Sequence, residues 1–186
     1  MKNQIGALAL FAVFGCVNSN PTLYLLETES IAAGSTTMEQ TVGVREIRLP
    51  DYAKDVRFVE RDPKGALTHQ EAHRWADRPT RAMTRALVGY LRDLTGTTVV
   101  SEPYPAGLLP DLTLTVELDV LDGRRNDSVR LRGRYRLRSP QGLSFHDVLL
   151  EEPVTGDTFS DVTAAYGKLL AALATRIHQD ALIKLQ

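Results

Sequence analysis

Residues 111–138 read DLTLTVELDVLDGRRNDSVRLRGRYRLR, and their pattern sets the architecture of the chain. Apolar and polar residues alternate in two runs on either side of residues 122–127, a segment rich in turn formers. A period of two is typical of a β-strand with one buried face. A register in which paired residue numbers sum to 249 sets Asp119 opposite Arg130 and pairs apolar residues on the other face. Because one register satisfies both faces, we predict an antiparallel hairpin.

The second run of this hairpin carries an arginine at every other position, and on a strand these side chains share one face. Five guanidinium groups on one face create a strong local field that could bind lipid head groups or an acidic partner. The simpler interpretation is a solvated sheet face, partly neutralised by acidic residues of the first run in pairs worth about 0–1 kcal/mol each. The five residues are Arg130, Arg132, Arg134, Arg136 and Arg138.

Two helices are expected, one on each side of the hairpin in the sequence. Residues 79–95 carry apolar side chains at helical spacing, with Asp77 as the expected cap and Gly96 as the end. A second apolar stripe predicts a helix over residues 161–185, with Ser160 as its cap. The arginines of the first helix fall mostly outside its apolar stripe, which predicts a solvated helix face.

Short strands are expected at four other places in the chain. Alternating or β-branched runs predict them at 23–26, 41–49, 56–59 and 143–151, the last with a bulge near His146. Strands, a helix, a strand meander and a second helix then follow one another along the chain. This order favours an α+β fold: a single domain with an antiparallel β-sheet and two helices packed on one face.

The composition excludes several classes of protein. The chain has 186 residues, 43% of them hydrophobic, and a formal net charge of −1, which fits one globular domain and argues against a strongly basic nucleic-acid binder. Its one cysteine excludes a disulfide framework. His69 and His73 have the spacing of helical metal ligands, but Gln70 stands where the zincin motif has glutamate, and no third ligand is apparent. We therefore expect no metal, no cofactor and no enzymatic activity.

The amino end has the pattern of an export signal. Lys2 precedes an uncharged apolar run at 5–14, which is too short to span a bilayer as a helix. Gly15 and Cys16 follow, and this ending resembles the lipobox of bacterial lipoproteins. The resemblance implies that residues 1–15 are removed and that Cys16 receives acyl chains, palmitate among them, which hold the chain at a membrane. The alternative is a buried thiol in a first helix or strand.

The residue after the cysteine bears on the destination. It is Val17 rather than the aspartate that retains enteric lipoproteins at the inner membrane, so the same resemblance implies the outer membrane, facing the periplasm. Residues 16–22 would then be a lipidated tether and residues 23–186 the folded domain.

Trp75 is the one tryptophan of the chain. The simpler interpretation is an anchor that packs the segment before the first helix onto the domain. The alternative is a contact for a partner, because tryptophan is enriched at binding hot spots.

Four stretches carry a resemblance to a known family through their order along the chain. They read YLL (24–26), VREIRLPDY (44–52), FVER (58–61) and EAHRWA (71–76). With the lipobox, they make the chain similar to the PqiC family of ABC-type transport auxiliary lipoproteins, also called YmbA-like or DUF330. The resemblance covers most of the chain after the cysteine.

This resemblance implies a non-enzymatic part of an intermembrane phospholipid transport system. Family members act with an MCE-domain protein and an inner-membrane transporter subunit, and the lipoprotein would dock that conduit at the outer membrane and support membrane integrity. Two alternatives stay open: a periplasmic module that itself carries a lipid, and a structural envelope lipoprotein without transporter partners. A homo-oligomer is also open, and nucleic acid is not expected. The candidate contacts besides Cys16 are Pro50, Tyr52, Trp75, Arg130, Arg132, Arg134 and Arg136.

Overall fold

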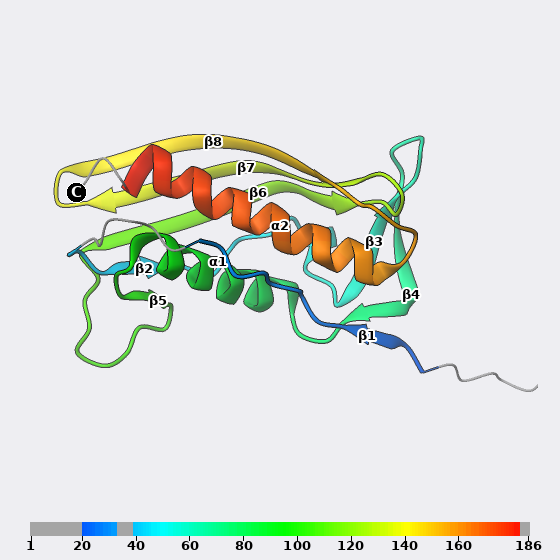
Figure 1. Cartoon of the computed structure of the whole chain (residues 1–186), viewed down its shortest axis with the longest axis horizontal. Helices are drawn as coiled ribbons and strands as arrows, with labels where there is room; N and C mark the ends of the chain where they lie inside the picture. Colours follow the sequence, from blue (N-terminus) through cyan, green and yellow to red (C-terminus); the bar gives the residue numbers. More distant parts are fainter. Residues whose placement is uncertain (1–19, 33–38, 183–186) are drawn as a thin grey trace, which may run out of the picture.

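The computed structural model describes residues 20–32 and 39–182 of the chain (Figure 1). The predicted signal peptide at 1–15 and the predicted lipidation site, Cys16, lie outside these residues. The first strand already begins at Thr22, inside the predicted tether of residues 16–22.

The described chain forms eight strands, two α-helices and two short helical turns. The strands are β1 (Thr22–Tyr24), β2 (Val42–Val44), β3 (Arg57–Arg61), β4 (Leu67–Trp75), β5 (Val99–Ser101), β6 (Leu112–Gly123), β7 (Ser128–Ser139) and β8 (Gly142–Pro153). The helices are α1 (Pro79–Thr95) and α2 (Phe159–Ile177), and the turns are a 3-10 turn at Asp51–Ala53 and a π turn at His178–Leu182.

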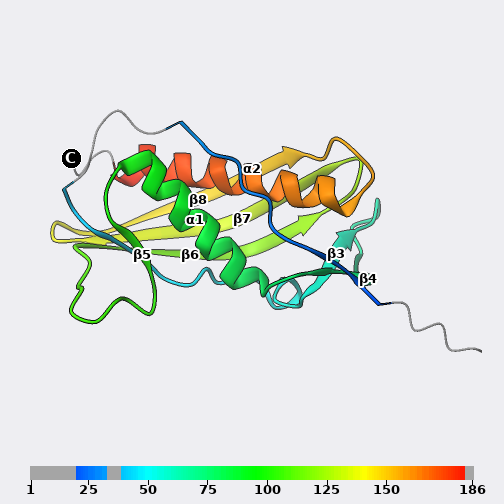
Figure 2. The same cartoon turned by 60° about the horizontal axis from the view of Figure 1, so that its bottom comes forward.

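All eight strands belong to one sheet. Its order is β1-β4-β3-β6-β2-β5, and β7 and β8 continue from β6 on its other edge. Both helices lie side by side on one face of this sheet (Figures 1 and 2), so the predicted α+β fold is confirmed. The sheet is mixed rather than antiparallel, because the three-residue strands β1, β2 and β5 pair in parallel with strands distant in the sequence.

The predicted hairpin of β6 and β7 forms, but in a different register. Leu118 pairs with Gly133, whereas the predicted register set Asp119 opposite Arg130. A bulge at Asp119 shifts the pairing on its two sides. Gly133 permits this arrangement, because a Cβ there would lie 2.1 Å from the carbonyl oxygen of Glu117. The alternation of β6 therefore changes phase at the bulge, which no residue type in β6 signals.

The hairpin of β7 and β8 lacks the bulge predicted near His146. All twelve pairs from Ser128 to Ser139 keep one register, which the two-residue turn at 140–141 sets. Phe145 is 61% exposed and Val148 is 5% exposed, so the two side chains lie on opposite faces, as an unbroken alternation requires. The prediction of a bulge in β8 is therefore wrong.

The first helix has its predicted bounds, and its cap differs from the prediction. Pro79 occupies the first turn of α1, and Gly96 ends the helix in the left-handed conformation at φ 62°. The N-cap is Arg78, which makes no side-chain capping bond. The predicted cap, Asp77, instead accepts a hydrogen bond at Oδ1 from the Arg78 amide.

The second helix starts earlier than predicted and ends earlier as well. Its N-cap is Thr158 rather than Ser160. The Thr158 hydroxyl accepts from the Asp161 amide, and the Asp161 carboxylate accepts from the Thr158 amide, which completes a capping box. The α-helix ends at Ile177, where the chain passes into the π turn.

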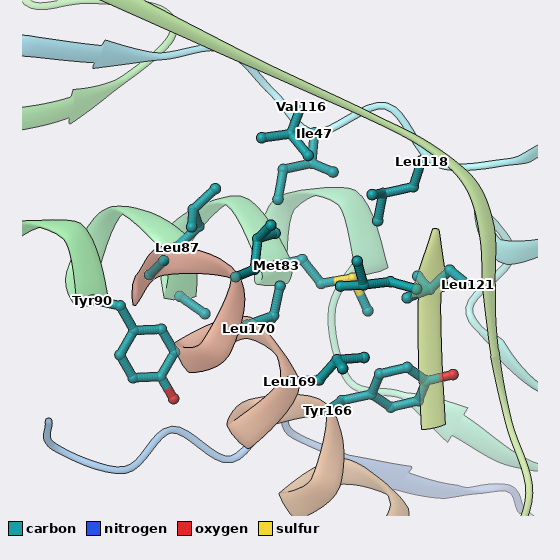
Figure 3. Packing of buried hydrophobic residues seen from close by; sticks show 14 of the residues in the cluster. Ile47, Met83, Leu87, Tyr90, Val116, Leu118, Leu121, Tyr166, Leu169 and Leu170 are labelled. Carbon is teal, nitrogen blue, oxygen red and sulfur yellow. The ribbon is translucent and has the colours of Figure 1, made fainter. Parts of the chain in front are cut away.

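The core fills the space between the sheet and the helices (Figure 3). Its central side chains come from α1, α2 and β6, and each is at most 1% exposed: Met83, Leu87, Leu169, Leu170 and Val116. Burial of each such side chain stabilises the fold by about 1.5–3 kcal/mol. None of the helices within the described residues is long and apolar enough to cross a membrane.

The segment that follows β1 runs along both helices (Figure 2). The Tyr90 hydroxyl of α1 donates to the Gly167 carbonyl of α2 at 3.2 Å and accepts from the Glu29 amide at 3.3 Å. Gly167 approaches this segment so closely that a Cβ would lie 2.0 Å from the Glu27 carbonyl oxygen. The amino-terminal segment is thus held by both helices at once.

Candidate docking surface on the outer face of the sheet

The face of β6, β7 and β8 that the helices leave uncovered, here named the outer face, carries the predicted arginine stripe. Odd-numbered side chains of β7, such as Tyr135, are buried on the helix side, so the even-numbered ones lie on the outer face. The structure thus brings the five arginines of the stripe, the four candidates among them, together on one surface. Arg132, Arg134 and Arg138 are exposed, and Arg130 and Arg136 are half-buried.

The ion pairs of the central arginines are loose. The Arg134 guanidinium lies 3.9 Å from the Asp147 carboxylate, and that of Arg136 lies 4.0 Å from Glu117. Pairs this long between solvated side chains contribute about 0–1 kcal/mol. Two further arginines of the stripe have no ion pair with any residue that the structure describes; these are Arg132 and Arg138.

An apolar line runs beside the arginines, and the sequence interpretation missed it. It consists of Leu143, Phe145 and Leu149 of β8, which are 48%, 61% and 71% exposed. Leu149 pairs with Arg132 across the two strands, and Leu143 pairs with Arg138. The two-residue turn at 140–141 is the signal that could have found this line, because it places odd-numbered residues of β8 beside the arginines. Exposed apolar side chains next to guanidinium groups suit a partner that is both apolar and anionic.

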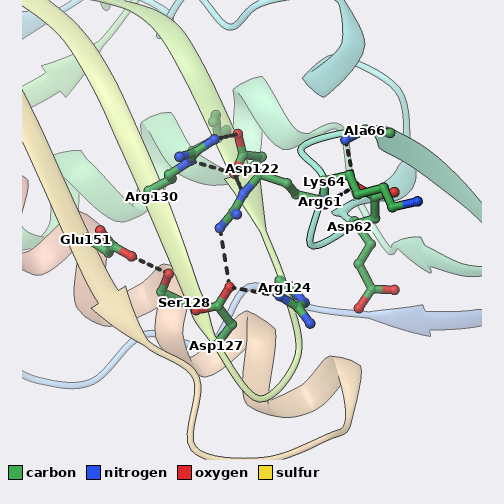
Figure 4. Close-up of polar contacts among 12 residues, drawn as sticks. Arg61, Asp62, Lys64, Ala66, Asp122, Arg124, Asp127, Ser128, Arg130 and Glu151 are labelled. Atoms are coloured by element: carbon green, nitrogen blue, oxygen red, sulfur yellow. Dashed lines mark hydrogen bonds and ion pairs between the residues drawn. The ribbon is translucent and has the colours of Figure 1, made fainter.

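Arg130 differs from the other arginines because it is held by a buried carboxylate (Figure 4). Asp122 is 3% exposed, and it accepts from Arg61 Nε at 2.9 Å and from Arg130 Nε at 2.9 Å. The hydrogen bond to Asp122 raises the pKa of the Arg130 guanidinium. Arg130 is therefore part of an ion-pair cluster that joins β3, β6 and β7, and its guanidinium is less available to a partner.

The candidate turn at Pro50 and Tyr52 packs against the sheet. The Tyr52 hydroxyl accepts from the Leu121 amide at 3.0 Å, and the Tyr52 carbonyl lies 3.2 Å from His69 Nε2. Burial is the main cause that raises the pKa of the Tyr52 phenol. Both Pro50 and Tyr52 are half-buried, so this turn chiefly fixes the chain between β2 and β3 against β6.

Trp75 lies in an aromatic cluster away from the arginines. It is 7% exposed, and its ring centroid lies 4.3 Å from that of Phe58 and 5.6 Å from that of Tyr166. Tyr166 belongs to α2, so Trp75 links the end of β4 to the second helix. The geometry fits the anchor interpretation rather than a partner contact.

The two histidines considered as metal ligands lie on β4, a strand that the sequence interpretation missed. Residues four apart on a strand are about 13 Å apart along it, so His69 and His73 cannot share one ion. His73 instead stacks on Phe159 with ring centroids 4.2 Å apart and bonds the Tyr24 hydroxyl through Nδ1 at 2.9 Å. Among the described residues, no group of three or more His, Cys, Asp or Glu side chains could hold a metal ion.

The space between the sheet and the helices is almost filled. A hollow between Phe58, Met83 and Tyr166 measures about 10 Å³, which is about the space that one water molecule needs. A larger hollow of about 490 Å³ is a groove open to solvent between α1 and the amino-terminal segment. Asp77, Asp93 and Arg85 are among its lining residues, which makes it partly charged.

The family of the chain follows from a family model that matches residues 24–178, described as the ABC-type transport auxiliary lipoprotein component. The chain belongs to this family. No curated protein matches the chain significantly.

Two solved structures share the fold of this auxiliary lipoprotein component. One is a crystal structure of an uncharacterised protein, with 19% identity and a TM-score of 0.71 over 87% of this chain and 98% of that one. The other is protein XCC0632 from Xanthomonas campestris, of the DUF330 family, with 14% identity and a TM-score of 0.70 over 84% and 92% of the two chains.

Proposed function

We propose that this chain is the lipid-anchored periplasmic component of an MCE-type phospholipid transport system. It docks the MCE conduit at the outer membrane and thereby supports membrane integrity. The match to the transport auxiliary lipoprotein family over residues 24–178 carries this proposal. The export signal at 1–15 and the lipobox cysteine, Cys16, support the lipid anchor.

The outer face supports a docking role for the folded domain. Its exposed arginines lie beside the exposed side chains of the apolar line, and a patch that combines the two is typical of a binding surface. The turn that contains Pro50 packs against the sheet, and Trp75 packs in the aromatic cluster. The docking surface therefore centres on Arg132, Arg134 and Arg138. Arg136, half-buried beside Glu117, lies between them.

The alternative of a lipid-carrying module has less support. A module of that kind needs an elongated apolar cavity that encloses most of an acyl chain. The hollow of about 10 Å³ between Phe58, Met83 and Tyr166 is far too small for one, and the groove of about 490 Å³ beside α1 is open to solvent and lined in part by Asp77, Arg85 and Asp93. Lipid would therefore pass through the partner conduit rather than through this domain.

Affinity purification of the full-length protein from mildly solubilised membranes, followed by mass spectrometry, tests the proposal. We expect an MCE-domain protein to be recovered with the wild type. The Cys16→Ala variant should leave the outer-membrane fraction, and it should recover less of the partner because the two are no longer held at the same surface.

A matched pair of variants tests the docking surface. Arg132→Glu reverses a charge on the outer face and should reduce recovery of the partner, whereas Arg81→Glu makes the same change on the exposed side of α1 and should not. Absence of any MCE or transporter subunit from the wild-type sample would contradict the proposed function.

A further inference from the structure

Strand β8 forms one margin of the sheet. It pairs with β7 alone, and no other strand among the described residues pairs with its second edge (Figure 1). Free edges present unpaired N–H and C=O groups to any extended chain, and most proteins protect them with lysine, proline or bulges. β8 contains no lysine, its one proline is its last residue, and its pairing with β7 has no bulge.

The direction of the backbone groups follows from parity along β7. The Arg124 amide donates to the Ser128 carbonyl at 2.9 Å, so even-numbered residues of β7 bond to β6 and odd-numbered ones to β8. Each odd-numbered residue of β7 pairs with an even-numbered residue of β8. The Val154 amide, just after β8, donates to the Asp127 carbonyl, just before β7, at 2.9 Å. This bond likewise joins an even-numbered residue on the β8 side to an odd-numbered residue on the β7 side. The odd-numbered residues of β8 therefore direct their N–H and C=O groups to the free edge.

These same odd-numbered residues hold the apolar line. Leu143, Phe145 and Leu149 thus combine free backbone groups with exposed apolar side chains on the outer face. Arg138 and Arg132 stand beside the two ends of this line, and neither has an acidic partner within the described part of the chain. The edge consequently offers main-chain bonding, apolar contact and two arginines without an acidic partner in the described chain, and the carboxylates of Asp147 and Glu151 share this face of the strand.

We infer that the free edge of β8 is a strand-addition site for an extended segment of a partner protein, in which every second residue faces outward and these outward residues are both apolar and acidic. The main-chain bonds come from the odd-numbered residues of β8, as in other cases of β-augmentation. Apolar side chains of the segment cover Leu143, Phe145 and Leu149, and acidic ones bond to Arg132 or Arg138. The identification of this partner as the transport conduit rests on the proposed function. The chemistry of the edge does not depend on that function.

The test uses the whole folded protein and a peptide of about ten residues, which is long enough to line a strand. Every second residue of this peptide is valine or glutamate in turn, so that both kinds share one face, and threonine fills the positions between them. Binding should slow hydrogen–deuterium exchange of the amides at 143, 145, 147, 149 and 151. The same peptide with lysine in place of each glutamate should bind about tenfold more weakly, because its cations face the arginines.

Two variants at one position separate the backbone from the side chain. Asp147→Pro removes an N–H at the free edge without removing a bond between β7 and β8, and should weaken binding of the glutamate peptide about tenfold. Asp147→Ala removes the same exposed carboxylate but keeps the N–H, and should bind the glutamate peptide at least as tightly as the wild type, because one like charge is removed from the edge. If circular dichroism shows that Asp147→Pro does not fold, Leu149→Asp serves instead, because it interrupts the apolar line at an exposed side chain.

Several results would overturn the inference. They are unchanged exchange of the β8 amides at millimolar peptide, equal binding by Asp147→Pro or Leu149→Asp, and protection of the same amides by phosphatidylglycerol vesicles or by a second copy of the chain instead of the peptide. The proposed function fails separately. Recovery of an MCE protein with both the wild type and Asp147→Pro supports the proposed function and rejects the free edge of β8 as the docking site. Peptide binding without recovery of an MCE protein supports the strand-addition site and contradicts the proposed function.

Discussion

Removal of the Asp122 carboxylate should destabilise the protein strongly, because this buried group is the shared partner of two cations. Asp122 accepts from Arg61 Nε at 2.9 Å and from Arg130 at 2.9 Å and 3.2 Å. The change Asp122→Ala deletes all three bonds and leaves both guanidinium groups beside an apolar methyl group. The loss therefore includes the cost of stranded charge as well as the bonds themselves.

The two arginines contribute unequally to that cost. The Arg61 side chain is 15% exposed and, among the residues that the structure describes, keeps only Asp127 at 3.5 Å, so much of its charge stays buried. The Arg130 side chain is 39% exposed and can turn to water. Breaking a buried pair costs about 3–5 kcal/mol, and the rehydration of Arg130 favours the lower end, about 3 kcal/mol. Out of a total stability of about 5–15 kcal/mol, this is a large share.

Urea unfolding followed by circular dichroism measures the effect. With a slope of about 2 kcal/mol per molar urea, the midpoint should fall by about 1.5 M. Asp147→Ala serves as the control, because its carboxylate is 91% exposed and 3.9 Å from Arg134, and should change stability by less than about 0.5 kcal/mol.

A double variant distinguishes stranded charge from lost packing. Adding Arg61→Met to Asp122→Ala removes the buried unpaired cation and should restore part of the stability. The reasoning is refuted if Asp122→Ala lies within about 1 kcal/mol of the wild type, or if the double variant is no more stable than the single one.

Further predictions concern the backbone, a helix cap and pH. Gly133→Ala should destabilise by about 3 kcal/mol or more in thermal melting, because its methyl group collides with the β6 backbone, whereas Gly89→Ala in α1, with nothing within 4 Å of the new Cβ, should stabilise by up to about 1 kcal/mol. Thr158→Ala removes the capping box and should cost about 1 kcal/mol in the same assay. Burial and the Asp180 carboxylate raise the pKa of Tyr135 to about 12 from 10.0. Because the folded state holds this proton more tightly, the stabilisation present below pH 10 is lost as the pH rises toward 12. Tyr135→Phe should therefore lose less stability than the wild type across that range in urea unfolding, and an equal loss would contradict this cause.

Much of the architecture could be predicted from local pattern. The bounds of α1 follow from an apolar stripe with proline at one end and glycine at the other, signals that agree with one another. The long strands β6 and β7 follow from alternation alone. The strands β1, β2 and β5 have three residues each and pair in parallel with distant partners, so no local signal specifies their place in the sheet.

The errors at the candidate surface have one physical origin. Alternation within a strand says which residues share a face, but the neighbouring strand decides which face is buried. Gly133 on β7 admits the bulge at Asp119 on β6, and the tight turn before β8 directs Phe145 outward. The arginines were predicted together because they occupy a single strand. The apolar line was missed because its exposure depends on the register between two strands.

The contacts of the amino-terminal segment determine the order in which the molecule can be completed. This segment holds β4 through β1, Tyr90 through the Glu29 amide, and Gly167 through the close approach at Glu27. A polypeptide is made from its amino end, so residues 22–29 must wait for α2, which is encoded much later in the chain, before all their native contacts exist. In a nascent chain that lacks α2, this segment lacks its contact with Gly167. Residues 22–29 thus complete the fold late and cannot nucleate it.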